Sequence, residues 1–281
     1  MNNLITRTVS GIFFVAVMVG AILYDAKTFI VLFGIITALA VWEFCTLVNN
    51  KRELQVNRLI STAAGLYLYL AMMAFCTGAS GAAIFIPYLI TLMYLLISGL
   101  YMRSPRSLEN WVFAFASQLY IALPFALMNV LAFRMQSGMS GLAYIPALPL
   151  GLMIFLWTND MGAYCFGSML QRFVPFKLFP SVSPHKSWIG SIGGGLVTVI
   201  AAVIMSRYFT FMPPVQWVGM ALVVVVFGTW GDLVESLLKR NLGVKDSGRF
   251  LPGHGGVLDR FDSSLLAIPA VVLYLYTLEI M

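Results

Sequence analysis

The chain has 281 residues, of which 60% are hydrophobic and only 10% are charged, and its mean hydropathy is +0.90. Soluble proteins carry about 25% charged residues, so this chain has too few polar side chains to cover a water-facing surface. The composition excludes a soluble globular enzyme, a secreted disulfide scaffold and a disordered protein. The net charge of +6 is expected in cytoplasmic loops of a membrane protein, and no nucleic-acid partner is predicted.

Long apolar stretches follow one another along the chain. A helix needs about 20 apolar residues to cross the hydrocarbon core, and these runs are too long for barrel strands. We therefore predict an all-α polytopic fold: one integral-membrane domain over 1–281, with N-terminal helices in 1–140 and a catalytic half in 141–281. The first stretch is interpreted as an uncleaved span rather than a signal peptide. The nine predicted spans are 8–24, 28–48, 59–77, 82–100, 110–133, 142–158, 188–206, 215–231 and 264–281.

The basic residues predict the orientation of these spans. With nine spans, the N-terminus and alternate loops share one side of the membrane, and that side holds most of the 17 lysine and arginine residues. The positive-inside rule places this side in the cytoplasm and the C-terminus outside. The predicted location is therefore the inner (cytoplasmic) membrane of the cell.

The sequence supports predictions for two further kinds of residue, an acid within a span and the cysteines. Glu43 is an acid inside the second predicted span. It is either a functional residue or a structural one that snorkels or pairs with Lys51 or Arg52. The three cysteines lack metal-ligand spacing and are expected to be small buried hydrophobes; they are Cys45, Cys76 and Cys165.

Most of the remaining polarity lies in two long loops, residues 157–195 and 231–263, which the orientation places on the cytoplasmic face. The second loop begins with polar residues spaced so that one helix face carries them all. These residues are Asp232, Glu235, Ser236, Lys239 and Arg240. The pattern is equally typical of an interfacial helix with ion pairs such as Glu235–Lys239.

The end of the second loop has the composition of a phosphate and metal site. The glycines around His254 can turn backbone N–H groups toward an anion. Asp259 and Asp262 are three residues apart and offer oxygen ligands of the kind that Mg²⁺ prefers. Helix capping is the alternative for each aspartate, and a packed turn residue is the alternative for His254. The nearby basic residues either bind substrate phosphates or contact lipid headgroups.

These residues resemble the phosphatidate cytidylyltransferases, the CDP-diacylglycerol synthases. The C-terminal signature of that family has the form S-x-x-K-R-x4-K-D-x-G-x4-P-G-H-G-G-x-x-D-R-x-D. It is matched here from Ser236 to Asp262. Two further segments, beginning at Asp160 and at Ser183, resemble D-x-x-A-Y-x-x-G and S-P-K-K-[ST]-x-E-G. His185 replaces a usual lysine and Ile189 a usual glutamate, so the second departure puts full activity in question.

The resemblance implies that CTP and phosphatidate react to give CDP-diacylglycerol and pyrophosphate, with Mg²⁺ as cofactor and a second metal ion left open. The implied catalytic residues are Asp232, Asp259, Lys186 and His254. The implied substrate-binding residues are Asp160, Ser183, Lys239, Arg240, Lys245, Gly255, Gly256 and Arg260. The metal ligands are expected to be Asp232, Asp259, Asp262 and Asp246.

Alternative functions stay open at this stage. The same fold could transfer a nucleotide to another lipid phosphate. The number of spans and Glu43 also fit a membrane transporter, although transporters gather ionisable residues near the bilayer midplane. A catalytically inactive scaffold is the third possibility, and a homodimer is left open.

Overall fold

The structure is a computed structural model that describes residues 2–101, 105–135, 142–170, 176–248 and 255–280. The chain forms two compact units. The N-terminal unit comprises residues 1–146 and 242–261, and the C-terminal unit comprises residues 147–241 and 262–281. The described parts of the second polar loop in this unit, residues 242–248 and 255–261, therefore pack with the N-terminal helices.

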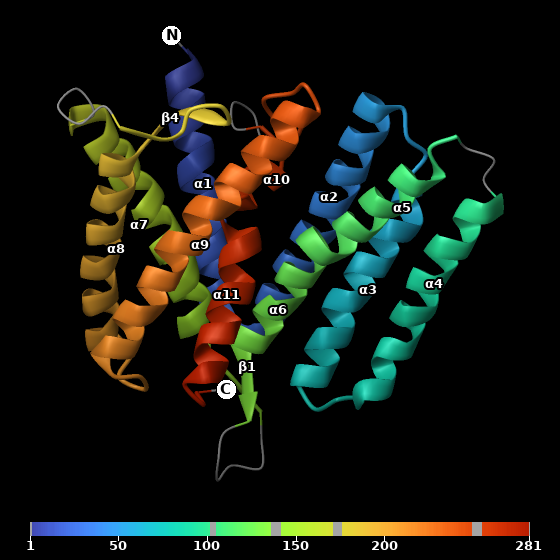
Figure 1. The fold of residues 1–281 in the computed structure, drawn as a ribbon. Helices are drawn as coiled ribbons and strands as arrows, with labels where there is room; N and C mark the ends of the chain where they lie inside the picture. The colour runs from blue at the N-terminus through green and yellow to red at the C-terminus, as the bar shows by residue number, and fades with distance from the viewer. Residues whose placement is uncertain (1, 102–104, 136–141, 171–175, 249–254, 281) are drawn as a thin grey trace. The chain divides into compact units, whose positions relative to one another are not determined.

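The N-terminal unit consists of helices and one short hairpin (Figure 1). In the hairpin the strands are antiparallel, with Phe133 opposite Tyr144. The helices α2 and α3 lie side by side. The elements are α1 (Asn2–Tyr24), α2 (Ala26–Arg52), α3 (Arg58–Cys76), η1 (Ala82–Phe85), α4 (Ile86–Tyr101), α5 (Ser107–Ala116), the π-helical turn η2 (Ser117–Ala122), α6 (Leu123–Ala132), β1 (Phe133–Met135), β2 (Leu142–Tyr144) and α10 (Leu258–Phe261).

Side-chain amides fasten the helices of this unit together. The Asn49 side chain donates to the backbone carbonyl of Val56 and accepts from its N–H, both at 2.9 Å, which fixes the turn between α2 and α3. The buried Gln118 side chain donates to the carbonyl of Ser61 at 2.8 Å and joins η2 to α3. In an apolar interior an unpaired polar group is costly, so such bonds specify how the helices pack.

The C-terminal unit packs its helices through glycine. A Cβ on Gly162 would lie 2.9 Å from the Cα of Gly194, and one on Gly193 would overlap the ring of Phe166. Small residues allow α7 and α8 to approach this closely, as is common between helices in membranes. The elements are α7 (Ala147–Leu170), β3 (Lys177–Phe179), β4 (Ser183–Ser187), α8 (Trp188–Tyr208), α9 (Pro214–Asn241) and α11 (Ser264–Thr277).

The helical membrane fold predicted from composition is confirmed at the level of a multi-pass protein. Each predicted span overlaps a helix or a run of successive helices. Within the described ranges, six helical segments are long and apolar enough to cross a membrane. The count of nine spans and the orientation stay predictions.

Some details differ from the sequence-based expectations. The sixth predicted span begins at Ala147 rather than at residue 142, because residues 142–144 pair with β1. The β3–β4 hairpin was not predicted either. The three cysteines are free, but Cys76 is half-buried and Cys165 is exposed, so the expectation of burial is wrong for Cys165. Cys45 is buried, as expected.

Candidate active site

A polar pocket of about 330 Å³ lies among α7, β4, α8 and α9 of the C-terminal unit. It brings together four residues that the sequence analysis singled out: Asp160, Ser183, Lys186 and Asp232. His185, one of the two departures from the family pattern, also lines it. The other lining residues are Asn159, Ala163, Tyr164, Ser187, Gly190, Ser191 and Thr229.

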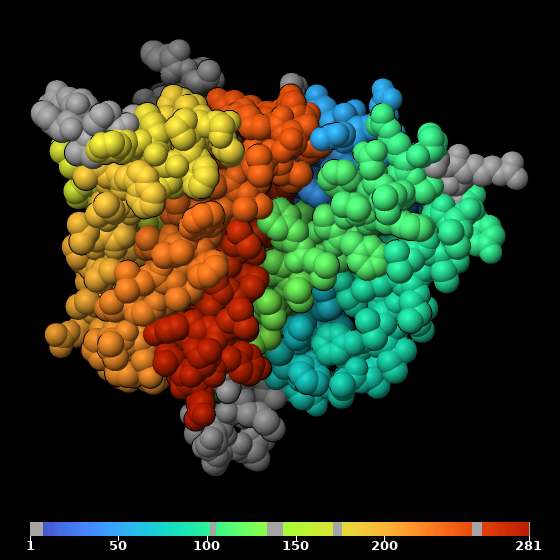
Figure 2. All heavy atoms as spheres, in the orientation of Figure 1, coloured from blue at the N-terminus to red at the C-terminus, as the bar shows by residue number. Residues whose placement is uncertain are grey.

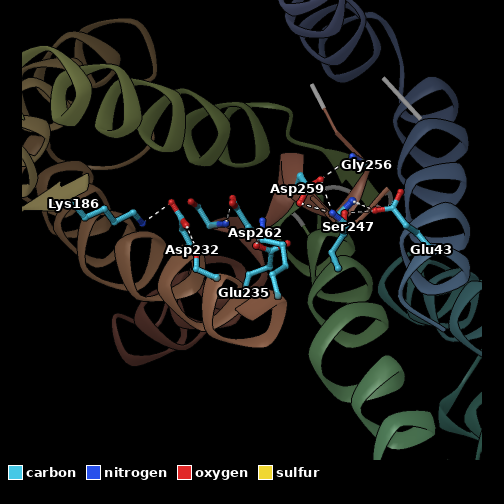
Figure 3. Close-up of polar contacts among 12 residues, drawn as sticks. Glu43, Lys186, Asp232, Glu235, Ser247, Gly256, Asp259 and Asp262 are labelled. Atoms are coloured by element: carbon cyan, nitrogen blue, oxygen red, sulfur yellow. Dashed lines mark hydrogen bonds and ion pairs between the residues drawn. The ribbon is translucent and has the colours of Figure 1, made fainter. Parts of the chain in front are cut away.

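Two residues of the pocket lining form an ion pair (Figure 3). Lys186 Nζ on β4 lies 2.5 Å from Asp232 Oδ2 on α9, and the two side chains are 25% and 27% exposed. The Ser236 hydroxyl donates to the other carboxylate oxygen of Asp232 at 3.2 Å. Ion pairs that water reaches contribute little to stability. This pair therefore adds little to stability, and both of its charged groups are open to a charged ligand.

The start of α8 forms one wall of the same pocket. The Ser187 side chain caps the helix by accepting the Gly190 N–H at 3.2 Å. A Cβ on Gly190 would lie 2.8 Å from the carbonyl oxygen of Ala163, so glycine lets the first turn approach α7. The Trp188 N–H donates to the carbonyl of Phe176 at 3.1 Å, so two N–H groups of this turn are already satisfied, but the helix dipole still favours an anion at this end. Together with the Lys186 ammonium, this end of α8 suits a phosphate group.

Carboxylates of the C-terminal unit repel one another beside this pocket. Asp262 lies in the turn between α10 and α11. Its pKa is raised well above the usual value, first by burial and then by the neighbouring charges of Asp232, Glu235 and Asp160. A bound cation would relieve this repulsion, and oxygen ligands of this kind suit Mg²⁺.

Asp232 and Asp262 are thus candidates in this unit for holding a metal ion. Among the residues that the structure describes, however, no group of three or more His, Cys, Asp or Glu side chains is close enough to hold one. The other expected ligands, Asp246 and Asp259, belong to the N-terminal unit. A metal ion shared by Asp232 and Asp259 stays a prediction.

The predicted polar face of α9 is partly structural. Glu235 is fully buried and forms an ion pair with Lys239 one turn later. This confirms the Glu235–Lys239 pair that the sequence offered as the alternative to a binding role. Arg240 is exposed.

In the N-terminal unit, Glu43 holds the loop that precedes α10 (Figure 3). Its carboxylate accepts the backbone N–H groups of Val257 and Leu258, at 2.8 and 3.1 Å, and the hydroxyl of Ser247. A Cβ on Gly256 would overlap this carboxylate, so glycine is required there. The partners that the structure shows for Glu43 are Ser247, Val257 and Leu258, and its pairing with Lys51 or Arg52 stays a prediction.

Asp259 closes the same loop from the other side. Its carboxylate oxygens accept the Ser247 N–H at 3.1 and 2.9 Å and the Gly256 N–H at 2.8 Å. Gly255 has φ +82°, and a Cβ there would overlap the Asp259 carboxylate. The N–H of Gly256 thus points toward a carboxylate of the chain itself. This local role resembles the capping role that the sequence offered as the alternative for Asp259.

The remaining predicted site residues are exposed or lie outside the described residues. Lys245, Asp246 and Arg260 are exposed. His254 lies outside the described residues. The sequence analysis missed Ser247 and the partners of Glu43. The presence of an acid within an apolar span was a signal for Glu43, but nothing local indicated partners about 200 positions away in the chain.

Comparisons with known proteins agree with this chemistry. The profile of the cytidylyltransferase family matches residues 5–278. A phosphatidate cytidylyltransferase of Staphylococcus aureus strain COL is 33% identical over 266 residues, which cover 94% of this chain and 95% of that protein. Proteins of the same name from Staphylococcus haemolyticus and Staphylococcus epidermidis are 32% identical, over 266 and 251 residues. The chain belongs to the cytidylyltransferase family.

Proposed function

We infer that this protein transfers the cytidylyl group of CTP to phosphatidate, giving CDP-diacylglycerol and pyrophosphate. The observation that carries this inference is the polar pocket with the Lys186–Asp232 ion pair, in a chain that matches the family over nearly its whole length. The pocket holds a cation, an anion and a helix N-terminus, which are the groups that phosphate chemistry requires. Family membership favours this enzyme over a transporter.

In the proposed reaction, an oxygen of the phosphatidate phosphate attacks the α-phosphorus of CTP. A new bond forms between this oxygen and Pα. The bond between Pα and the oxygen that bridges to the β-phosphate breaks, and pyrophosphate leaves. The attacking phosphate is already ionised near neutral pH, so no strong base is needed. Lys186 and the first turn of α8 would bind and orient one of the two anions and lower their mutual repulsion. Lys239, Arg240 and Lys245 stay proposed phosphate contacts, and the glycine turn around His254 stays the proposed contact of the departing pyrophosphate.

We also propose that the enzyme uses Mg²⁺. Asp232 and Asp262 would hold the ion, and Asp259 and Asp246 are the further candidates that the family pattern suggests. The ion would supply positive charge for the phosphates as negative charge moves onto pyrophosphate. The position of Asp262 supports this proposal, because burial raises its pKa first and the charges of Asp232, Glu235 and Asp160 raise it further, and a cation would stabilise the ionised carboxyl. The site is expected to face the cytoplasm, from which CTP arrives.

Purified protein in detergent micelles tests the function directly. With labelled CTP, phosphatidate and Mg²⁺, we expect CDP-diacylglycerol and pyrophosphate in equal amounts. Omission of phosphatidate or addition of EDTA should stop both. Replacing phosphatidate by an isoprenoid phosphate or an ether-lipid phosphate tests the alternative acceptors. Turnover of one of these, but not of phosphatidate, would contradict the proposed substrate.

A further inference from the structure

An apolar groove of about 530 Å³ lies on the outer side of α8 and α9 in the C-terminal unit. The side chains that line it are mainly aliphatic and aromatic. Several of these side chains are half exposed, including Trp188, Ile192, Val226 and Trp230. The β3–β4 hairpin borders one end of the groove. There the rings of Phe179 and Trp230 meet edge-on, with their centroids 5.9 Å apart. In Figure 2 the yellow atoms of this hairpin lie beside the orange atoms of α9.

The groove adjoins the polar pocket. Ser191 on α8 and Thr229 on α9 line both of them. One side of these two residues therefore faces Lys186 and Asp232, and the other faces the apolar side chains. A molecule that fits both spaces needs an anionic group joined to a hydrocarbon chain.

The glycines at 193–195 distinguish this groove from an ordinary helix contact. Side chains at Gly193 and Gly194 would overlap α7, so these two glycines serve helix packing. A Cβ on Gly195 would instead meet only Val225, at an ordinary 3.4 Å. Packing therefore does not require glycine at 195, but an open groove does, because Gly195 lies in its wall.

The length of the groove matches one leaflet. On α8 it runs from Trp188 to Val199, which is about 16 Å at 1.5 Å per residue. Half of the hydrocarbon core measures about 15 Å. A lipid whose phosphate lies beside Lys186 would thus have room for one chain along the groove.

We propose that one acyl chain of the lipid phosphate substrate lies in the α8–α9 groove while its phosphate occupies the polar pocket. The proposal rests on the proposed function and specifies how that substrate is bound. Lipid tails are as apolar as the groove, so the groove contributes orientation and chain selection rather than hydrophobic affinity. The enzyme should therefore distinguish substrates by the length and shape of this chain.

Gly195→Leu tests the proposal by filling the groove. The readout is kcat/KM for dioleoyl phosphatidate relative to dihexanoyl phosphatidate, whose short chains end near the polar pocket. We expect the dioleoyl value to fall about tenfold and the dihexanoyl value to change less than about twofold, with KM for CTP unchanged. Gly20→Leu is the matched control, because its Cβ has open space on α1, and it should leave both values unchanged.

Each outcome decides between binding in the groove and ordinary contact with bulk lipid. Equal losses on both lipids, or no loss on either, would overturn the proposal while the wild-type protein still made CDP-diacylglycerol. If Gly195→Leu does not fold, Val226→Trp fills the groove from its half-exposed α9 side and must show the same selective loss. If the wild-type protein used neither lipid, the proposed function itself would fail.

Discussion

Two groups of carboxylates in this protein have the same chemistry but different surroundings. Glu43 and Asp259, in the N-terminal unit, accept several backbone N–H groups from one loop. Asp232 and Asp262, in the C-terminal unit, face a lysine and other acids. Asp262 accepts a backbone N–H as well, from Ser263 at 2.6 Å. Several N–H donors from one loop tie a carboxylate to the fold, whereas neighbouring acids favour a cation beside it. The second group is therefore the better suited to charged ligands, and Asp259 stays only a further candidate for the metal ion.

Asp232→Asn should give the largest effect. It removes the charge that we expect to bind metal and that pairs with Lys186, so CDP-diacylglycerol synthesis should fall by about 10²–10³-fold. The amount of protein in the membrane should stay the same, because the ion pair is partly exposed. The exposed Glu109→Gln on α5 is the matched control, measured in the same assay. Wild-type turnover in Asp232→Asn would remove this residue from the site.

Glu43→Gln should act through stability as well as activity. The amide can accept fewer N–H bonds than the carboxylate, so the free energy of unfolding should fall by about 1–3 kcal/mol. Displacement of the loop should lower kcat by about tenfold to hundredfold. Thermal unfolding in detergent and steady-state kinetics measure the two effects. If Glu43→Gln matched the wild-type melting temperature while Asp232→Asn lowered it, the assignment of the two groups would be reversed.

Asp262→Asn should change stability in the opposite direction. Because the pKa of Asp262 is raised in the folded state, its ionised form destabilises the fold above the pKa of the unfolded state. In EDTA at neutral pH, the variant should melt higher than the wild type by about 2 °C. The difference should shrink as the pH falls toward about 4, where the unfolded carboxyl is protonated. A lower melting temperature at neutral pH would show that Asp262 is not under repulsion.

Ile189→Glu should give the smallest effect. Residue 189 lies on the first turn of α8, where an added acid interacts favourably with the helix dipole. We expect activity to rise by less than about fivefold, because Lys186 and Asp232 are already in place. Unchanged or reduced activity in the CTP assay would show that the departure at this position does not limit the enzyme.

Most of the fold could be predicted from the sequence, because membranes restrict it strongly. A stretch of about 20 apolar residues in lipid must satisfy its backbone hydrogen bonds internally, so each predicted span forms helix. The two hairpins could not be predicted in this way. Their strands are only three to five residues long, and pairing of the strands, rather than hydrophobic periodicity, defines them.

The residues of the site also divide into those that the sequence indicated and those whose role depends on the tertiary structure. Resemblance to family motifs singled out Asp160, Ser183 and Lys186, and helical spacing singled out Asp232; these four residues line one pocket. Only the tertiary structure decided the role of Glu43, because its partner Ser247 is 204 residues away in the chain. The packing of residues 242–248 and 255–261 with the N-terminal helices was decided in the same way. Local sequence determines which groups a segment offers, but the donors that approach a carboxylate depend on how distant segments pack.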